Sequence, residues 1–240
     1  MGTNTLPIVF DGGHYRLGGI DYENVYGIVI ILDALGVKGI WKTKNPEKVL
    51  QNWNKVNYAF SDNLSRLQGV HFSAFSDTII ISVRGHTRLN NQPRRFVEII
   101  CDSIIPAFLR SMDYDFFFRG VIAVGYFSRS AKTLIGPAVD DAANCYEKAD
   151  WVGISLSPST RSFLEQSVVR QTNSNCIVEY KIPQEPVNNY MTWAINWTEW
   201  DHTCKYWNIL VSKANLFAYD HRKYIKYKNT LDFYCACRQT

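Results

Sequence analysis

The stretch VYGIVIILDALG, residues 25–36, is a continuous run of apolar residues that closes with an aspartate and a glycine. Valine and isoleucine dominate the run, and this pattern is typical of a strand that is buried on both faces of a sheet. We therefore predict a central strand here, with Asp33 at its end.

Helices and strands are predicted to follow this strand in alternation. NPEKVLQNWNKVNYAFSDNLSRLQG (45–69) begins near a proline and spaces its apolar residues as an amphipathic helix does. VHFSAFSDTIIISVRG (70–85) predicts two strands that turn near Ser76 and Asp77. The remaining elements are a helix over 93–112 that bends near Pro106, a strand over 115–127, a helix over 136–149, a strand over 151–159 and a helix over 159–168.

The resulting order is β-α-β-β-α-β-α-β, which places a hairpin between two helices, as in the split βαβ plan of ferredoxin-like domains. Residues 170–240 are rich in Trp and Tyr, and CIVEYKIP and YMTWAINW within them predict a strand pair that extends the sheet. We expect an α+β domain over 25–240 with an antiparallel-rich sheet and a C-terminal αβ extension from about residue 170. The glycine-rich residues 1–24 are expected to form an irregular N-terminal extension.

The composition excludes several classes of protein. The chain has 240 residues, of which 46% are apolar and 20% are charged, as expected of one large globular domain. A net charge of +4 is too small to indicate a nucleic-acid scaffold. No window approaches the roughly 18 apolar residues of a membrane span, and the N-terminus lacks the pattern of a secretory signal. We expect a cytoplasmic protein with no nucleic-acid or membrane partner.

Two aspartates are predicted at one edge of this sheet. Asp33 ends the first strand, and Asp77 lies in the turn before a run of isoleucines. The split βαβ plan makes these strands neighbours. Two carboxylates at one place suit Mg²⁺ or Mn²⁺ when the ion also holds a triphosphate. The simpler alternative is that Asp77 is an ordinary solvated turn residue.

The residues after Asp33 add a short phosphate-binding pattern. The sequence ALGVKG (34–39) contains Gly36, Lys38 and Gly39. A glycine-containing turn lets backbone N–H groups approach phosphate oxygens, and the lysine adds a positive charge. This pattern is short and indicates a phosphate site weakly by itself. The two aspartates predicted beside it strengthen the interpretation.

Four stretches resemble, in chain order, the landmark motifs of the class III nucleotidyl cyclases. They are VIILDALGVKG, AFSDTIII, RGVIAVG and IGPAVDDAA, and their order and spacing cover residues 25–155. EKADWVGISLSPS, YKIP and AINW resemble the pyrimidine cyclases (PycC) of the bacterial Pycsar anti-phage systems. The resemblance implies the class III cyclase fold and a reaction that makes a 3′,5′-cyclic nucleotide.

The resemblance also implies where metal and phosphates would bind. Two divalent cations, Mn²⁺ or Mg²⁺, would be held by Asp33 and Asp77. Arg119 and Lys181 are cations at positions suited to a triphosphate, or else ordinary surface cations. The phosphates would be cradled by Ala34, Leu35, Gly36, Val37 and Lys38.

Two small hydroxyl residues, Ser73 and Thr133, stand where purine cyclases carry their base-reading side chains. Hydroxyls donate and accept hydrogen bonds, so they fit a uracil or cytosine edge without a fixed charge. A smaller base leaves space that Tyr58, Phe75 or Trp41 would fill by stacking, although core packing is the alternative role for each.

The last motif departs from the family pattern. Asp140 stands at the family's Asn, and Asn144 stands at its transition-state Arg. A carboxylate beside a triphosphate is unfavourable unless a cation intervenes. In a second alignment, Asn144 and Lys148 supply the Asn and the base one helical turn later. The sequence leaves both alignments open.

The predicted function is that of a pyrimidine nucleotide cyclase, which would act on UTP in preference to CTP. The resemblance implies a head-to-tail homodimer, in which the second chain supplies the helix over 137–149, and a product that acts on a separate effector in anti-phage defence. The alternatives are a degenerate cyclase-like domain that binds nucleotide and regulates a partner, a purine cyclase, and a diguanylate cyclase. A diguanylate cyclase would need a Gly-Gly-Asp/Glu-Glu-Phe hairpin, which FSDTI does not supply.

Overall fold

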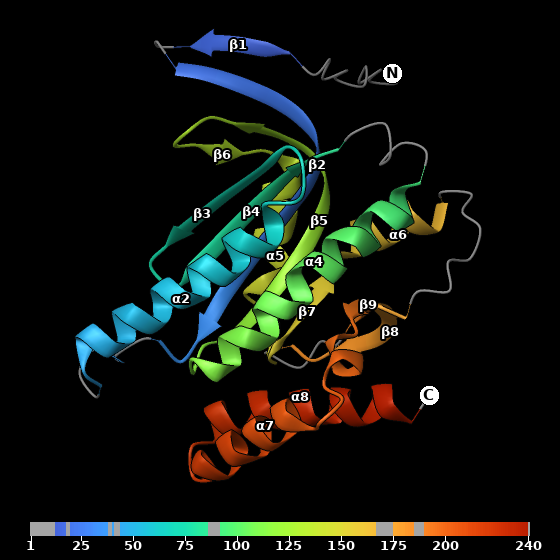
Figure 1. Ribbon diagram of the computed structural model, residues 1–240. Helices are drawn as coiled ribbons and strands as arrows, with labels where there is room; N and C mark the ends of the chain where they lie inside the picture. Colours follow the sequence, from blue (N-terminus) through green and yellow to red (C-terminus); the bar gives the residue numbers. More distant parts are fainter. Residues whose placement is uncertain are drawn as a thin grey trace.

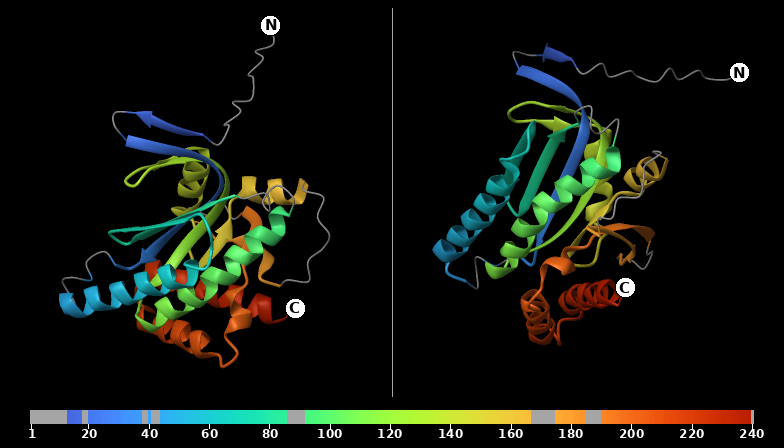
Figure 2. Two further views of the ribbon diagram at one scale, coloured as in Figure 1. Left: turned by 45° about the horizontal axis from the view of Figure 1, so that its top comes forward. Right: turned by 45° about the vertical axis from the view of Figure 1, so that its right-hand side comes forward.

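The structure is a computed structural model that describes residues 13–17, 20–37, 40, 44–85, 92–166, 175–184 and 190–239. These residues form one sheet with helices on both of its faces (Figures 1 and 2). The strands are β1 (His14–Leu17), β2 (Ile20–Leu35), β3 (Val70–Phe75), β4 (Thr78–Arg84), β5 (Phe117–Arg129), β6 (Leu134–Ile135), β7 (Gly153–Leu156), β8 (Ile177–Ile182) and β9 (Tyr190–Ile195).

The helices fall into three groups by position in the chain. They are α2 (Pro46–Leu64) and α4 (Pro93–Asp113), then α5 (Pro137–Tyr146) and α6 (Pro158–Gln166), and finally the 3₁₀ turn η1 (Trp197–Trp200), α7 (Lys205–Leu216) and α8 (His221–Arg238). Helix α2 begins as its sequence predicts, because the Asn45 side chain accepts a hydrogen bond from the N–H of Glu47 at 2.9 Å and Pro46 occupies the first turn. None of the described helices has the length and apolar character that crossing a membrane requires.

The order of the strands is β3-β4-β2-β5-β7-β9-β8, with β1 on β2 and β6 on β5. The first four of these, β3-β4-β2-β5, are arranged as in a ferredoxin-like sheet, so the predicted α+β fold is confirmed. Every pairing is antiparallel except that of β5 with β7. β2 is therefore a central strand, and it is flanked by β4 and β5.

Strand β2 is buried on both faces, as its continuous apolar run predicts. Ile28, Ile30 and Leu32 point to one face and belong to the core beneath α2 and α4. Val29 and Ile31 point to the other face and pack with Ala138 and Ala142 of α5. Side chains alternate along a strand, so Asp33 lies on the same face as Ile31. We call this face the α5 face.

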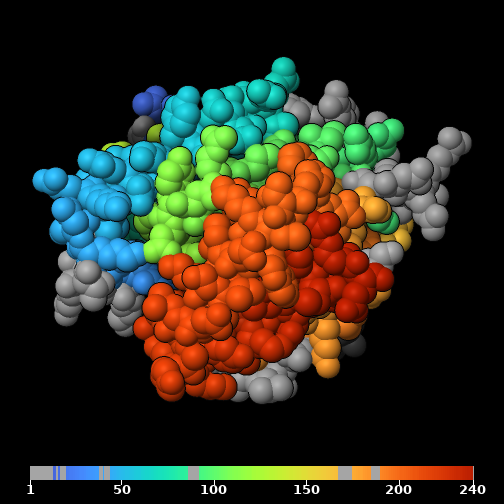
Figure 3. All heavy atoms as spheres, turned by 60° about the horizontal axis from the view of Figure 1, so that its bottom comes forward, coloured from blue at the N-terminus to red at the C-terminus, as the bar shows by residue number. Residues whose placement is uncertain are grey.

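The C-terminal residues add a second layer to one end of the sheet. The predicted strand pair is confirmed, because β8 pairs with β9 and β9 joins the sheet through β7. Helices α7 and α8 lie beneath this end (Figure 1), and in Figure 3 their orange and red atoms cover much of that surface. Phe233 of α8 packs edge-on against the buried ring of Trp151, with centroids 4.9 Å apart.

Two expectations about the first residues are corrected. Residues 14–17 and 20–24 are regular strand and not irregular chain, because His14 to Leu17 pair with Ile20 to Glu23. The central strand accordingly begins at Ile20 and not at Val25. The alternating polar residues of this segment obscured its strand character, since Ile20 and Asp21 are exposed while Val25 is buried.

Candidate active site

Asp33 and Asp77 meet at one end of the neighbouring strands β2 and β4. Asp33 lies near the end of β2, opposite Thr78 of β4, and Asp77 immediately precedes Thr78 in the β3–β4 turn. The carbonyl of Asp77 accepts a hydrogen bond from the Ala34 N–H at 2.9 Å, which joins the turn to the end of β2. Ser76 makes the tight turn possible with a φ of 57°. The structure therefore brings both carboxylates to the same place.

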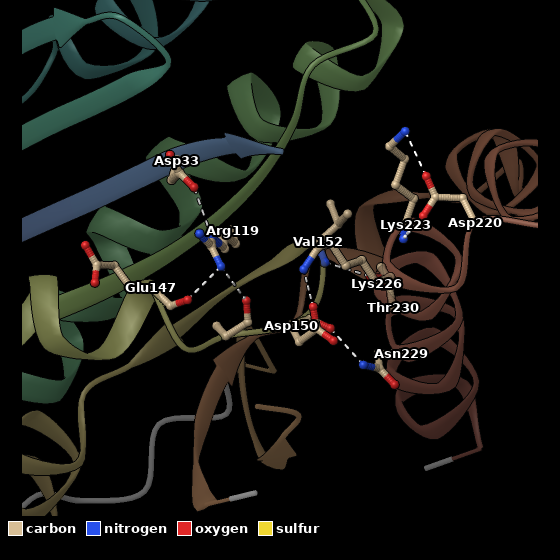
Figure 4. A network of polar contacts seen from close by, with 11 residues as sticks. Asp33, Arg119, Glu147, Asp150, Val152, Asp220, Lys223, Lys226, Asn229 and Thr230 are labelled. Atoms are coloured by element: carbon tan, nitrogen blue, oxygen red, sulfur yellow. Dashed lines mark hydrogen bonds and ion pairs between the residues drawn. The ribbon is translucent and has the colours of Figure 1, made fainter. Parts of the chain in front are cut away.

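Arg119 is the direct partner of Asp33. It stands opposite Asp33 on β5, and its Nε donates to Asp33 Oδ2 at 3.0 Å. Its Nη1 donates to the carbonyls of Glu147 at 2.8 Å (Figure 4) and Ala149 at 3.2 Å. Its guanidinium lies 5.8 Å from the ring centroid of Tyr146. Arg119 is thus held beside Asp33 by the residues that follow α5.

The environment of Asp33 disfavours its negative charge. Burial is the largest cause and raises the pKa of the Asp33 carboxyl. Arg119 lowers this pKa, whereas repulsion from Asp77 and Glu147 raises it, and the net pKa is above its ordinary value. A cation between the carboxylates of Asp33 and Asp77 would offset the cost of burying a negative charge and would reduce the repulsion between the two groups.

The donor set fits a hard divalent cation. Mg²⁺ and Mn²⁺ favour carboxylate oxygens and often take their remaining ligands from water and substrate phosphates. Among the described residues, no cluster of three or more His, Cys, Asp or Glu side chains could hold a metal by itself. Asp33 and Asp77 would therefore hold a cation that shares its coordination with a bound ligand.

The loop after Asp33 turns sharply at a glycine. Gly36 has a φ of 75°, in the left-handed region that favours glycine, and no atom lies within 4 Å of where a Cβ would stand. Ala34 is buried, Leu35 ends β2, and the carbonyl of Val37 accepts from the Ile40 N–H at 2.9 Å. Lys38, predicted to bind phosphate, and Trp41, predicted to stack, lie outside the described residues.

The base-reading candidates lie at separate points. Ser73 stands opposite Ile80, which in turn stands opposite Ile31, so Ser73 shares the α5 face with Asp33 and is exposed there. Thr133 lies in the turn between β5 and β6, where its carbonyl accepts from the N–H of Ser130. Ser73 and Thr133 are therefore at different positions along the sheet within one chain.

The two exposed aromatic candidates point in opposite directions. Phe75 is 80% exposed and stands opposite Thr78, on the same face as Asp33. Tyr58 is 69% exposed on the solvent side of α2, whose buried side faces the other face of the sheet. The structure brings Phe75 to the side of the aspartates and leaves Tyr58 away from them.

Helix α5 carries its candidates on its outer side. Ala138 and Ala142 fix the helix on the sheet, while Asp140 and Asn144 are one turn apart and exposed. Lys148, in the turn after α5, is exposed as well. The arrangement leaves these three side chains free to meet a second chain.

Lys181 lies far from the aspartates across the sheet. It is an exposed residue of the edge strand β8, and β5, β7 and β9 separate this strand from β2. With roughly 4.8 Å between neighbouring strands, one chain does not bring Lys181 to Asp33.

The fold resembles solved cyclase structures. The adenylyl cyclase CyaB from P. aeruginosa superposes with a TM-score of 0.52 at 12% identity, over 72% of this chain and 95% of that chain. The catalytic core of a rhodopsin-guanylyl cyclase with converted specificity, in complex with ATPαS, gives 0.51 at 14% identity, over 73% and 98% of the two chains.

This chain has the class III nucleotidyl cyclase fold. A third cyclase-fold structure, a double mutant of the guanylyl cyclase domain of the RhoGC fusion protein from the aquatic fungus Blastocladiella emersonii, gives a TM-score of 0.52 at 13% identity, over 72% and 97% of the two chains. No family model and no curated protein matches the sequence. At these identities the likeness to the cyclase fold concerns architecture alone.

Sequence reasoning missed what surrounds Arg119 in this cyclase fold. Its contacts with Asp33, Glu147 and Ala149 span 86, 28 and 30 positions along the chain, so no local pattern predicts them. The predicted split βαβ order was the one available signal, because it places the strand of Arg119 beside that of Asp33.

Proposed function

We propose that this protein is a nucleotidyl cyclase that converts a pyrimidine nucleoside triphosphate, UTP in preference to CTP, into its 3′,5′-cyclic monophosphate and pyrophosphate. The main support is the meeting of Asp33 and Asp77 at one edge of a sheet with the cyclase fold. Paired carboxylates at this position provide the ligands that a cation-assisted attack on a triphosphate requires.

Asp33 and Asp77 are the residues that would hold two divalent cations, Mn²⁺ or Mg²⁺. Bound there, such cations would favour ionisation of the ribose 3′-hydroxyl and neutralise charge on the triphosphate. The burial of Asp33 and its repulsion by Asp77 support this assignment, since both make the carboxyl pair a favourable place for positive charge.

In the proposed reaction the ribose 3′-oxygen bonds to the α-phosphorus and its proton passes to solvent. The bond between the α-phosphorus and the oxygen that bridges to the β-phosphate breaks, and pyrophosphate leaves. The backbone N–H groups of the loop 34–37 would hold phosphate oxygens. Arg119 would add a positive charge beside them, because its bonds to the Glu147 and Ala149 carbonyls keep it in place.

We place the complete site in a head-to-tail homodimer. Asp33 and Asp77 would come from one chain and the outer side of α5 from the other, with either Asp140 and Asn144 or Asn144 and Lys148 at the reacting phosphates. The exposure of these α5 residues supports this arrangement. Thr133 would reach the base only if the second chain brings it near Ser73, and Lys181 would likewise act across the dimer.

The preference for a pyrimidine base rests on Ser73 and Thr133. A purine that enters a site without its usual partners leaves base-edge groups unpaired, at a cost of about 1–3 kcal/mol each. Hydroxyls and backbone groups match the two carbonyls and the N3–H of uracil. Cytosine would be better served by a carboxylate near its amine, and neither of these two positions supplies one.

One experiment tests the proposal directly. Purified protein is offered equal UTP, CTP, ATP and GTP with Mn²⁺, and the products are identified by mass and compared by initial rate. We expect cyclic UMP to form fastest. ATP or GTP as the best substrate would contradict the pyrimidine assignment, and CTP as the best would contradict only the preference for uridine.

The second candidate is a nucleotide-binding regulatory domain without turnover. The observations that favour it are the Arg119–Asp33 ion pair, which already neutralises one carboxylate, and the altered residues Asp140 and Asn144. This candidate predicts nucleotide binding with no cyclic product from any of the four triphosphates. The same assay with a binding measurement separates the two functions.

The proposed biological role is the production of a second messenger in anti-phage defence. It rests on the resemblance of EKADWVGISLSPS and AINW to pyrimidine cyclases of such systems. The cyclic product would act on a separate effector protein in the cytoplasm. Bacteria that express either wild type or Asp77→Asn are challenged with phage, and their cyclic nucleotides are measured. This comparison tests the proposed role.

A further inference from the structure

We propose that the pocket between α7, α8 and the loop after β2 is a second ligand site, which takes a phosphorylated small molecule with a flat apolar group, such as a nucleoside phosphate. The pocket has a volume of about 620 Å³, within the range of small-molecule sites. It adjoins the candidate active site, because Leu35, Gly36 and Val37 line it and Leu35 and Phe117 stand two residues beyond Asp33 and Arg119 on their strands. Its lysines come from α7, α8 and the residues before α2, which distinguishes it from the carboxylate pair of Asp33 and Asp77.

The charged lining of this pocket favours an anion. It contains four lysines and one carboxylate, namely Lys44, Lys213, Lys223, Lys226 and Asp115. Asp115 forms ion pairs with two of the lysines, Lys44 and Lys213. Burial raises the pKa of Asp115, but its hydrogen bonds with Lys213 and Lys44 outweigh burial and lower it. One positive charge therefore remains uncompensated around Asp115.

The other two lysines lie on one side of α8. Lys223 pairs with Asp220 at 2.9 Å, and both side chains are about half exposed, so the pair is weak. Lys226 pairs with Asp150, which lies outside the pocket lining. Lysines are compact, mobile charges, and a phosphate group entering the pocket could draw both of them from these partners.

The pocket also has an aromatic wall for the apolar part of the ligand. Phe217 stacks on Tyr227 with ring centroids 5.8 Å apart, and Phe117 meets Tyr227 edge-on at 5.4 Å. Lys223 Nζ lies 5.1 Å above the Phe217 ring, and Lys213 Nζ lies 5.5 Å above the Phe117 ring. Apolar surface and cations are therefore interleaved, as a flat anionic ligand requires.

A chain of contacts joins this pocket to Asp33 (Figure 4). Asp150 pairs with Lys226, and its carbonyl accepts from Asn229 Nδ2 at 2.7 Å. The adjacent carbonyl of Ala149 accepts from Arg119, which pairs with Asp33. A ligand that draws Lys226 away from Asp150 would thus shift the segment that holds Arg119 and change how strongly Arg119 pairs with Asp33. The effect on metal affinity rests on the proposed metal site at Asp33.

Calorimetric titration in EDTA tests the site without metal or turnover. UMP, AMP and inorganic pyrophosphate are titrated into wild type, Lys44→Gln and Lys223→Gln, with Lys228→Gln as the matched control on the same helix but outside the pocket. We expect nucleotide to bind without metal, and each pocket variant to raise Kd by about tenfold or more. The Lys228→Gln value should stay near wild type.

Three results would overturn the site. They are no binding in EDTA, equal Kd values for wild type and both pocket variants, and nucleotide binding that requires Mn²⁺ and disappears in Asp33→Asn. The third would identify the catalytic site as the place of binding. Thermal melting of each variant shows that it is folded, and the exposed positions of Lys44 and Lys223 favour this outcome.

The coupling is tested by measuring Mn²⁺ affinity with and without saturating nucleotide monophosphate. Because coupling is reciprocal, we expect the monophosphate to change the Mn²⁺ affinity of wild type and Mn²⁺ to change the monophosphate affinity equally. Unchanged affinities would overturn the coupling. Absence of cyclic product in the assay above would contradict the proposed function and leave the EDTA result standing.

Discussion

At the scale of single residues, the Asp33–Arg119 pair shapes the candidate site. The two side chains are each about four-fifths buried, and burial of an ion pair is costly unless additional hydrogen bonds satisfy it. The carbonyls of Glu147 and Ala149 supply those bonds to Arg119. Within the part of the chain that the structure describes, the Asp33 side chain accepts a hydrogen bond from Arg119 alone, at Oδ2, which leaves its other carboxylate oxygen for a cation.

We expect Asp77→Asn to fold normally and to lose turnover by several orders of magnitude, because an amide replaces a charged ligand. Asp77 lies in a turn, so its carbonyl bond to Ala34 does not depend on the side chain. Initial rates with UTP and Mn²⁺ measure the effect. Asp62→Asn, on the exposed side of α2, is the control and should keep wild-type activity; near-native turnover in Asp77→Asn would refute the metal assignment.

The stabilisation by Mn²⁺ should depend on pH. Because the pKa of Asp33 is raised in the folded protein, this carboxyl stabilises the metal-free fold most when protonated, and the contribution is lost as pH rises through the raised pKa. Mn²⁺ requires the ionised form, so its effect has the opposite direction. The Mn²⁺-induced increase in Tm should therefore shrink as pH falls toward that pKa.

Differential scanning fluorimetry at a series of pH values measures this dependence. Asp33→Asn is the control, since its Tm should respond weakly to Mn²⁺ throughout the series. An Mn²⁺ effect in wild type that is constant across the acidic range would contradict the assignment of Asp33.

At the scale of elements, α8 holds the segment between α5 and β7. Thr230 is fully buried, accepts from the Val152 N–H at 2.7 Å and donates to the Lys226 carbonyl at 2.7 Å. The neighbouring Asn229 donates from Nδ2 to the carbonyl of Asp150 at 2.7 Å. The segment that positions Arg119 on one side is therefore fixed by α8 on the other.

We expect Thr230→Val to lower the free energy of unfolding by about 1–3 kcal/mol, because it keeps the shape of the side chain and leaves the buried Val152 N–H without its acceptor. Urea denaturation measures the loss, and hydrogen exchange at Val152 should become faster. Thr230→Ser keeps the hydroxyl and should restore slow exchange. Slow exchange at Val152 in Thr230→Val would show that this contact does not hold the segment.

The elements that the sequence predicts are those with strong local patterns. The run of Val and Ile in β2 and the turn at Ser76–Asp77 sufficed for the central strand, the hairpin and the meeting of two aspartates. Helix α8 could not be predicted, since its sequence HRKYIKYKNTLDFYCACR shows no single apolar side. Its buried residues Tyr227, Thr230 and Phe233 are defined by contacts with segments distant in sequence.

At the scale of the whole molecule, the proposed site requires two chains. Asp33→Asn and Asn144→Ala should each be inactive alone, because each removes a different half of the shared site. Mixed after subunit exchange, they should regain part of the activity, since each heterodimer contains one intact site. Initial rates of the mixture measure the rescue.

The control for this mixture is Asp33→Asn combined with Asp77→Asn, which damage the same half and should not rescue each other. Lack of rescue by Asn144→Ala, in a sample in which exchange is verified by mass, would argue against the shared site.

The parallel pairing of β5 with β7 joins a part of the sheet that is synthesised early to a part that is synthesised later. During synthesis the strands β1 to β6 and helices α2, α4 and α5 emerge before residue 153, whereas the remaining strands and α8 follow on the order of ten seconds later. Until then, Phe117 and Trp151 lack the aromatic cover that Tyr227 and Phe233 later provide. A nascent chain stalled near residue 200 exposes Phe117 and Trp151 but lacks α8, so it should bind a chaperone that recognises apolar segments and release it once α8 has left the ribosome.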